Sequence, residues 1–379
     1  MDLKDLQKYG HSIWLDSIRR DLLTSGELAR LVKDDGIRGV TTNPTIFEKA
    51  IAGTNLYDAS LERHVRAQDG RAPFLYEQLA IEDIQQAADI LRPVYDATDR
   101  RDGYINMEVS PLLAHDTAGT VDEGRRLWRK VRRDNLMIKV PGTSEGVPAI
   151  EQLTSEGIVF SRAACQQVFE AYMSGLESLV RSGEPIGGMA SVASMFVSRI
   201  DAKLDAELEA RAATAPDDVG VALRHLVGKV AIANARLAYQ DWKATCQGAR
   251  WQALASQGGR AQRLLWASTG TKDPHFRDVL YVESLIGPET IDTVPPATLD
   301  AMRDHGTAEN RLEQGIDEAR DILSALARAG ISLDAVTRRL VQEGVTSFSA
   351  AFEKVMASIE SKRQAVLARP ASAPSTATR

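Results

Sequence analysis

Three ionisable residues interrupt apolar stretches of the sequence and could carry out nucleophilic and acid–base chemistry. Lys139 lies in NLMIKVPG, Asp16 in IWLDSI and Glu108 in INMEVS. A charged side chain removed from water is costly unless it is paired or changes its protonation state. A lysine that gives up its proton is a nucleophile for carbonyl carbon and can form a Schiff base. Together the three residues predict an acid–base site around a reactive amine.

Structural roles for the same residues stay open at this point. Lys139 could pair with a carboxylate or extend to solvent at the rim of the fold, and all three could form an interior salt-bridge network. Asn43, in TTNPTIFEKAI, could hydrogen-bond a substrate hydroxyl. Its residue type and the proline that follows it are typical of a helix N-cap, which we favour on this evidence alone.

Short apolar runs that alternate with helical patterns indicate the elements that hold these residues. Strands are expected at 12–18, 39–44, 104–110, 135–142, 187–196, 263–269 and 291–296, with a weak one at 157–161. The alternation predicts an α/β fold, a TIM (β/α)8 barrel with additional helices and a short or disrupted fifth strand. In such a barrel Ile138 and Val140 face the helices, which turns Lys139 towards the barrel axis near the carboxyl end of its strand.

The chain is expected to form one barrel domain, residues 1–363, with a helical elaboration at about 203–258. The residues that follow, 364–379, are expected to be a disordered tail. The last dozen residues, ARPASAPSTATR, are rich in Pro, Ala, Ser and Thr and carry no apolar pattern.

The composition argues against several classes of protein. With 44% apolar residues, 26% charged residues and a net charge of −6, the chain is typical of a soluble globular protein and not of a nucleic-acid binder. Cys165 and Cys246 form no CxxC pair, and the six histidines are scattered, so neither a disulfide framework nor a metal site is expected. The N-terminus is polar, and no apolar run reaches the roughly 18 residues of a membrane helix. We expect a cytoplasmic protein without metal, cofactor, nucleic-acid or membrane partner.

Many segments of the chain resemble the transaldolase family, in its longer bacterial form. The matching segments are IWLDSIRR, GVTTNPTIFEKAI, MEVSP, IKVPGTSEGVPAIEQLTSEGI, SVASMFVSRIDAKLD, GKVAIANARLAYQ, LLWASTGTKDP, LYVESLIGPETIDTVPPATL and GVTSFSAAFEKV. They extend from residue 12 to about 356, and their combination is specific. The resemblance implies a Schiff-base transferase of the pentose phosphate pathway, with sugar phosphates as its partners.

The resemblance also implies roles for the ionisable residues. Lys139 attacks the ketone of sedoheptulose 7-phosphate or fructose 6-phosphate, and Glu108 moves protons while the imine forms. Asp16 takes the proton of the C4 hydroxyl, so that the C3–C4 bond breaks and an aldose phosphate leaves. The remaining dihydroxyacetone unit passes to glyceraldehyde 3-phosphate or erythrose 4-phosphate. Asn43 holds the substrate, alone or in addition to its role as a cap.

The phosphate end of the substrate is assigned in the same way. The family pattern places Ser194 and Arg199 at the substrate and its phosphate, with Phe196 lining the pocket, and a guanidinium fork suits a phosphate. Lys272 follows the strand at 263–269, where barrels often bind phosphate, but shorter family members use an arginine near this point. Arg199 as a solvated helix residue and Lys272 as an exposed loop residue are the structural alternatives.

The sequence departs from the family pattern at its fifth strand. The family continues from LTSEGI into a strand that carries an Asn-x-Thr element before an FS pair, whereas here TSEGI runs directly into VFSRAACQQ. The asparagine helps to bind substrate, and the threonine positions a water between the glutamate and the lysine. Either a short, shifted fifth strand near 158–161 weakens proton transfer at Glu108, by about 10²- to 10⁴-fold, or the barrel has a gap.

The sequence is also consistent with two other functions. One is an aldolase that releases free dihydroxyacetone, and the other is a sugar-phosphate-binding barrel with impaired turnover. The retained Lys139, Asp16 and Glu108 favour an enzyme. The sequence leaves the oligomeric state open between a monomer and a homodimer.

Overall fold

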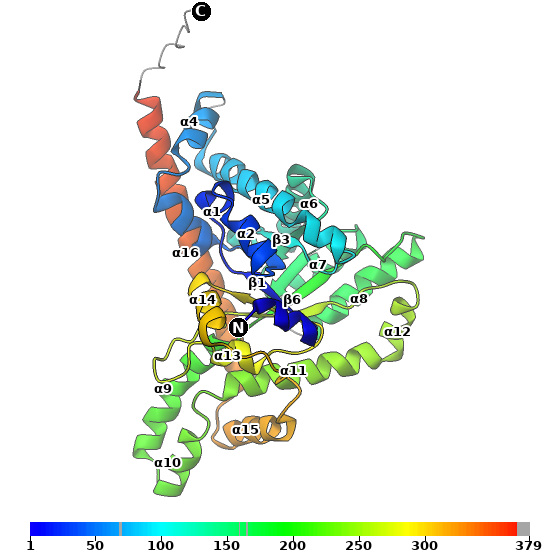
Figure 1. Ribbon diagram of the computed structural model, residues 1–379, viewed down its shortest axis with the longest axis vertical. Coiled ribbons are helices and arrows are strands. Elements are labelled where there is room, and N and C mark those ends of the chain that lie inside the picture. Colours follow the sequence, from blue (N-terminus) through cyan, green and yellow to red (C-terminus); the bar gives the residue numbers. More distant parts are fainter. Residues whose placement is uncertain (68–69, 159, 164–165, 370–379) are drawn as a thin grey trace, which may run out of the picture.

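The computed structural model describes residues 1–67, 70–158, 160–163 and 166–369. Eight parallel strands form a closed barrel in sequence order, and helices surround it (Figure 1). The strands are β1 (His11–Leu15), β2 (Gly39–Val40), β3 (Tyr104–Glu108), β4 (Leu136–Val140), β5 (Phe160–Ala163), β6 (Ser191–Phe196), β7 (Arg263–Ala267) and β8 (Thr290–Val294). The prediction of an α/β TIM barrel with additional helices is confirmed.

The fifth strand is short and begins later than expected. β5 spans four residues, with Phe160 opposite Ile138 on one side and opposite Ser191 on the other. The residues expected to start it still belong to the turn after the preceding helix, because the Ile158 amide donates to the Leu153 carbonyl at 3.0 Å. Residue 159, where the sequence departs from the family pattern, lies outside the described residues.

The helices fill the connections between the strands. They are α1 (Arg20–Thr24), α2 (Glu27–Asp34), α3 (Pro44–Phe47), α4 (Asp58–Ala67), α5 (Ala72–Ala97), α6 (Thr117–Val131), α7 (Gly146–Ser155), α8 (Gln166–Arg181), α9 (Ser198–Thr214), α10 (Asp217–Arg224), α11 (Val230–Gln247), α12 (Ala249–Ala255), α13 (Leu280–Ser284), α14 (Pro296–His305), α15 (Ile316–Arg328) and α16 (Leu333–Leu367). Short helical turns occur at Leu3–Tyr9, Glu48–Ala52 and Pro111–Leu113.

Four helices, α9 to α12, lie between β6 and β7, in the part of the chain where an elaboration was expected. Residues of α9, α11 and α15 form a second apolar core beside the main one. Asp201 ties this region to the barrel, because its carboxylate accepts the Ala231 amide at 2.8 Å and the Tyr281 hydroxyl at 3.0 Å. Figure 1 shows α9 and α10 extending away from the strands.

The C-terminal helix α16 is 35 residues long and runs along one side of the molecule (Figure 1, red). It packs on α3, α4 and α5 and also reaches α9. The expected start of a tail at residue 364 falls inside this helix, whose last turn is held by the buried Val366. Residues 370–379, the rest of the expected tail, lie outside the described residues.

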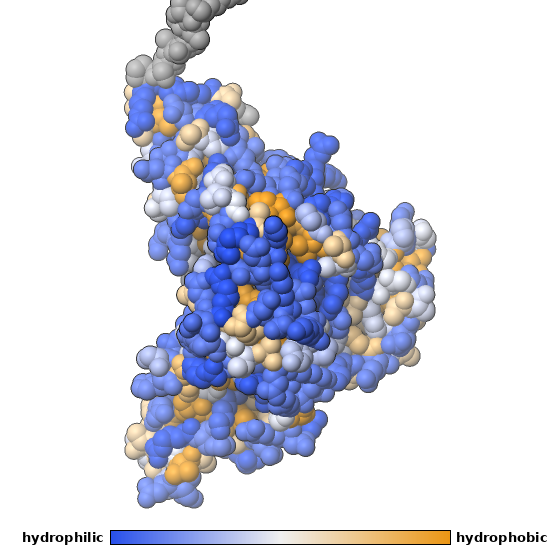
Figure 2. All heavy atoms as spheres, viewed as in Figure 1, coloured by the Kyte–Doolittle hydropathy of each residue, from blue (hydrophilic) through white to orange (hydrophobic). Residues whose placement is uncertain are grey.

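Many apolar side chains are buried in two hydrophobic cores, the main one and the second one, which includes residues of α9, α11 and α15. The face shown in Figure 2 is largely hydrophilic, with hydrophobic residues in small groups. The large apolar side chains exposed in the described part of the chain are Leu56, Leu112, Val219, Val221 and Leu367. None of the described helices combines the length and the apolar character needed to span a bilayer.

Gly39 in β2 allows a close approach that fixes the first two strands. A Cβ at this position would lie 2.4 Å from Cδ2 of Trp14, whose ring is 1% exposed. The ring is also held by a 3.0 Å hydrogen bond from its Nε1 to Asp102. We therefore expect Gly39→Ala to lower the free energy of unfolding by about 1–3 kcal/mol, measured by urea denaturation.

Gly187 provides the control for this prediction. The nearest atom to a Cβ at Gly187 would be the Gly258 carbonyl oxygen, at 3.6 Å, which is ordinary contact. Gly187→Ala should change the free energy of unfolding by no more than about 0.5 kcal/mol. Equal losses in the two variants would contradict a specific clash at Trp14.

Candidate active site

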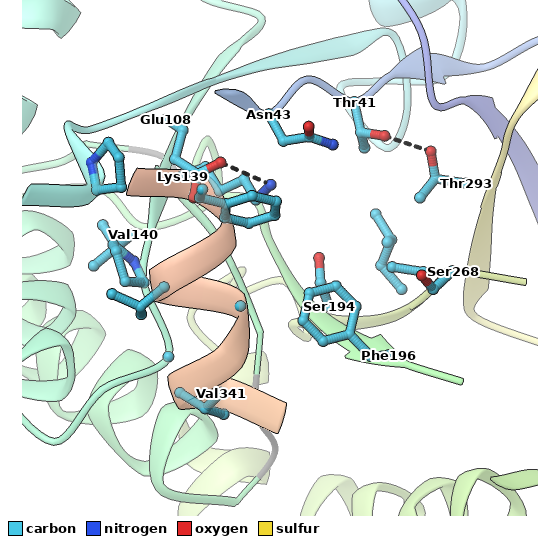
Figure 3. Close-up of a pocket in the computed structure, with 18 of the residues that line it drawn as sticks. Thr41, Asn43, Glu108, Lys139, Val140, Ser194, Phe196, Ser268, Thr293 and Val341 are labelled. Atoms are coloured by element: carbon cyan, nitrogen blue, oxygen red, sulfur yellow. Dashed lines mark hydrogen bonds and ion pairs between the residues drawn. The ribbon is translucent and has the colours of Figure 1, made fainter. Parts of the chain in front are cut away.

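A cavity of about 90 Å³ lies at the carboxyl ends of the strands, beside α16. Its lining includes Asp16, Asn43, Glu108, Lys139, Ser194, Phe196 and Arg199. A second hollow, of about 260 Å³, shares Ser194, Phe196 and Val341 with it. Figure 3 shows side chains from the barrel strands and from α16 around the same space. All the candidate residues except Lys272 therefore meet in one cavity.

The amine of Lys139 points into this cavity. Glu108 and Lys139 are partners in the pairing of β3 with β4, and Lys139 Nζ lies 3.0 Å from Glu108 Oε2 (Figure 3). The amine also donates to the Thr42 carbonyl at 3.1 Å and lies 5.4 Å from the centroid of the Phe348 ring. The two side chains are 17% and 7% exposed, so both the amine and the carboxyl group are largely removed from water.

Glu108 is placed to exchange a proton with this amine. Its burial raises the pKa of the carboxyl group, and the neighbouring charge of Lys139 opposes that shift. The amine of Lys139 is the one ionic partner of this carboxyl group among the described residues, at 3.0 Å from Oε2. A buried carboxyl group with a raised pKa can hold a proton nearer to neutral pH than an exposed one.

Asp16 follows β1 and is held on the far side of the cavity by two threonines. Thr41 Oγ1 donates to Asp16 Oδ1 at 2.7 Å and lies 2.6 Å from Thr293 Oγ1 (Figure 3). Since Thr41 uses its only hydroxyl proton on Asp16, Thr293 donates to Thr41. Burial raises the pKa of Asp16, while the Thr41 hydrogen bond and the charges of Lys139 and Arg199 act in the opposite direction.

Asn43 caps a helix and lines the cavity at the same time. Its Oδ1 accepts the Ile46 amide at 3.0 Å and so caps α3, which begins at Pro44. No described residue accepts a hydrogen bond from its amide nitrogen. The cap therefore occupies the oxygen and leaves the two N–H groups for another partner.

A guanidinium group forms the opposite wall. Arg199 lies over the Phe196 ring, 4.3 Å from its centroid, and its Nε donates to Ser268 Oγ at 3.2 Å. Ser194 points towards the same space from β6 (Figure 3). Lys272 is exposed and does not line the cavity, although its charge still acts on Asp16. Its role at a phosphate stays a prediction.

Several residues of the site were not singled out from the sequence. Thr41 and Thr293 orient Asp16, and Ser268 contacts Arg199 from a left-handed backbone position with φ of 59°. The next residue, Thr269, donates to the buried Asp292 at 2.7 Å, and burial raises the pKa of Asp292 to about 8. Nothing in the local sequence WASTGTK indicated that Ser268 would contact Arg199.

The helix α16 closes one side of the cavity. Val341, Gly344, Val345 and Phe348 line it, about 200 residues after the lysine in the sequence. The fifth-strand segment, where the Asn-x-Thr element is missing, has its side chains at residues 159–166 outside the described part of the chain. The expected weakening of proton transfer at Glu108 stays a prediction. Within the described part, no cluster of three or more His, Cys, Asp or Glu residues could hold a metal ion.

Comparison with known proteins agrees with this geometry. The family model described as Transaldolase/Fructose-6-phosphate aldolase matches residues 13–359. Transaldolase 2 of Nostoc sp. is 46% identical over 371 residues, which cover 95% of this chain and 97% of that protein. The transaldolase of Thiobacillus denitrificans is 47% identical, with 94% and 99% covered, and that of Acidothermus cellulolyticus is 44% identical, with 94% and 95% covered. The chain belongs to the transaldolase/fructose-6-phosphate aldolase family.

Proposed function

We propose that the protein is a transaldolase that moves a dihydroxyacetone unit from a ketose phosphate to an aldose phosphate through a Schiff base on Lys139. The observation that carries this proposal is the Lys139 amine inside the barrel, 3.0 Å from Glu108, with Asp16 in the same cavity. Sedoheptulose 7-phosphate and fructose 6-phosphate are the donors of this reaction, which belongs to the pentose phosphate pathway. The absence of paired cysteine spacings supports a reducing compartment such as the cytoplasm.

The first half of the reaction forms the imine. The neutral amine of Lys139, after passing a proton to Glu108, attacks the ketone carbon of the donor. Glu108 then returns a proton to the hydroxyl group of the carbinolamine, which leaves as water and yields the protonated imine. The contact between Nζ and Oε2 makes this exchange direct, and the low exposure of both groups limits competition from bulk water.

The second half breaks and remakes a carbon–carbon bond. Asp16 removes the proton of the C4 hydroxyl, the C3–C4 bond breaks, and its electron pair enters the imine to give an enamine. The aldose phosphate leaves, and the enamine attacks the carbonyl carbon of the acceptor while Asp16 returns the proton. The hydrogen bond from Thr41 supports this role, because it fixes the orientation of the carboxylate without neutralising it.

Arg199 binds the substrate phosphate in this proposal. We expect Arg199→Gln to raise the KM for fructose 6-phosphate by about 10- to 100-fold, because a charge-assisted hydrogen bond contributes about 1.5–3 kcal/mol. Steady-state kinetics with erythrose 4-phosphate as acceptor would measure the change. Lys272→Gln, outside the cavity, should have a smaller effect. An equal rise for unphosphorylated fructose would contradict phosphate binding by Arg199.

Dependence on the acceptor separates the transferase from the aldolase that the family description also names. With fructose 6-phosphate alone, a transaldolase should release about one equivalent of glyceraldehyde 3-phosphate per site and then stop. Added erythrose 4-phosphate should restore turnover. Continuous release of dihydroxyacetone without acceptor would identify the aldolase, and the absence of any burst would identify a sugar-phosphate-binding barrel.

A further inference from the structure

Two adjoining cavities lie at the amino end of the barrel, opposite the proposed active site. They have volumes of about 220 and 350 Å³ and share Thr98 and Arg101. Their walls come from residues at or before the starts of strands, including His11 of β1, Arg38 before β2 and Arg263 of β7. The catalytic groups occupy the other ends of these strands, so the proposed reaction makes no use of either cavity.

The walls of the two cavities carry more positive than negative charge. Their arginines are Arg38, Arg100, Arg101, Arg260 and Arg263, and their carboxylates are Asp99, Asp102 and Glu289. This local excess of cations contrasts with the net charge of −6 for the whole chain. A concave surface that concentrates arginines attracts anions, and phosphate suits the guanidinium fork.

Part of this arginine cluster serves the fold. Arg263 is 5% exposed and donates to Asp102 at 3.0 Å, to Ser12 at 2.7 Å and to the Thr290 carbonyl at 2.8 Å. These bonds close the base of the barrel around Trp14. The Nε of Arg263, however, has no acceptor among the described residues, although the side chain lines the larger cavity. A buried N–H group without an acceptor is costly, and an anion in this cavity would satisfy it.

The other arginines at the mouth are available to a ligand. Arg100 makes no ion pair with a described residue, and its guanidinium lies over Gly188, where a Cβ would be 2.9 Å from Nη1. Arg260 pairs with Asp99, and Arg101 pairs with Glu289, and these carboxylates are 90% and 50% exposed. Both arginines also donate to backbone carbonyls, Arg260 to Gly187 and Arg101 to Gly10, so these bonds keep the side chains at the mouth while the ion pairs can open. Exposed ion pairs contribute at most about 1 kcal/mol, so a phosphate can displace them at little cost.

Backbone strain is concentrated at the same cavity. Asp99, Arg100 and Glu289 have φ values of 49°, 63° and 59° and are three of the five non-glycine residues with positive φ in the described chain. Each such residue costs free energy, and strain of this kind collects at ligand-binding sites. The strained turns hold Arg100 and the two rim carboxylates at the mouth.

We propose that the larger amino-terminal cavity binds a phosphate group, either as inorganic phosphate or on a small phosphorylated metabolite. A volume of about 350 Å³ suits a ligand of this size. The smaller cavity adds a neutral acceptor for a ligand hydroxyl. His11 Nδ1 donates to Thr290 Oγ1 at 2.9 Å, because the Thr290 hydroxyl itself donates to the Gly287 carbonyl. His11 Nε2 has no hydrogen-bond partner within the described part of the chain.

Isothermal titration calorimetry on full-length Arg199→Gln protein tests this proposal. The Arg199→Gln change weakens phosphate binding in the proposed active site, so that binding at the amino end can be measured separately. Inorganic phosphate and glycerol 1-phosphate are the two probes, and glycerol is the negative control. We expect one phosphate site in this background and at least a 10-fold loss of affinity when Arg100→Gln is added. Arg133→Gln, which removes a surface partner of Asp89, is the matched control and should leave the affinity unchanged.

Arg100 is exposed and forms no ion pair with any residue that the structure describes, so its replacement should leave the fold intact, which circular dichroism would verify. Equal affinity for both probes would identify free phosphate as the ligand chemistry, and tighter binding of glycerol 1-phosphate would identify a phosphorylated metabolite. Crystals soaked in selenate should show anomalous density beside Arg100 and Arg263. Absence of binding in Arg199→Gln, or binding that Arg100→Gln does not weaken, would overturn the proposal.

Discussion

Replacing Lys139 with alanine should abolish covalent capture of the substrate and lower turnover by about 10⁴-fold or more. The reaction has no other route for electrons from the breaking C3–C4 bond once the imine is gone. The cavity should persist, because the neighbouring Ile138 and Val140 remain buried. Glu108 would lose its partner cation, so the variant should also be compared with wild type for stability by thermal unfolding.

Borohydride reduction in the presence of fructose 6-phosphate, followed by intact mass measurement, provides the readout. Wild-type protein should gain the mass of one reduced adduct per chain, and Lys139→Ala should gain none. Lys243→Ala is the matched control, because Lys243 of α11 lies outside the cavity, forms an ion pair with Glu313 and should not affect trapping. An adduct that persists without Lys139 would place the nucleophile elsewhere and disprove the proposed mechanism.

Replacing Asp16 with asparagine should lower turnover by about 10²- to 10⁴-fold while leaving the covalent adduct intact. Asparagine preserves the shape of the side chain and can still accept the Thr41 hydrogen bond, but it cannot take up the C4 hydroxyl proton. The protein should therefore form the imine and stall before the carbon–carbon bond breaks. Rapid-quench measurement of glyceraldehyde 3-phosphate release would detect the stall, and loss of the adduct as well would assign Asp16 to imine formation.

The pH dependence of this variant gives an independent check. Burial raises the pKa of Asp16, and a base acts only in its ionised form. In the wild type, kcat/KM should fall as the pH decreases through this raised pKa, at a higher pH than the value of about 4 for an ordinary aspartate. The decrease in kcat/KM that protonation of Asp16 causes at low pH should be absent from the pH profile of Asp16→Asn. An acid limb at the ordinary carboxyl pKa would contradict the buried base.

The sequence predicted the barrel, and it singled out residues that the barrel brings into one cavity, because both depend on short-range patterns. Alternation along NLMIKVPG placed Lys139 opposite to Ile138 and Val140, and the parallel register then brought Glu108 beside it. Asp16 and Glu108 stood out because charged residues are rare in apolar strands. Asn43 was ambiguous for a physical reason, since its carbonyl oxygen caps α3 while its amide group remains free at the cavity.

Features that depend on long-range packing or on irregular backbone were not predictable in this way. Thr41 and Thr293 meet only because β8 closes the barrel onto β1, and Ser268 reaches Arg199 from a left-handed turn. β2 is limited to Gly39 and Val40, although the Thr41 amide still donates to the Leu15 carbonyl of β1 before α3 begins at Pro44. The position of Lys272 outside the cavity follows from the loop after β7, whose path has no periodic sequence signal.

The position of α16 in the cavity wall has a consequence for how the protein is made. A ribosome completes all eight strands, and with them Lys139, Glu108 and Asp16, before it adds Val341 and Phe348. Until those residues dock, the amine faces bulk water on the side that α16 later covers. We therefore expect the amine to be fully desolvated only after the last long helix has docked, so that the emerging barrel reacts little with metabolite carbonyls during its own translation.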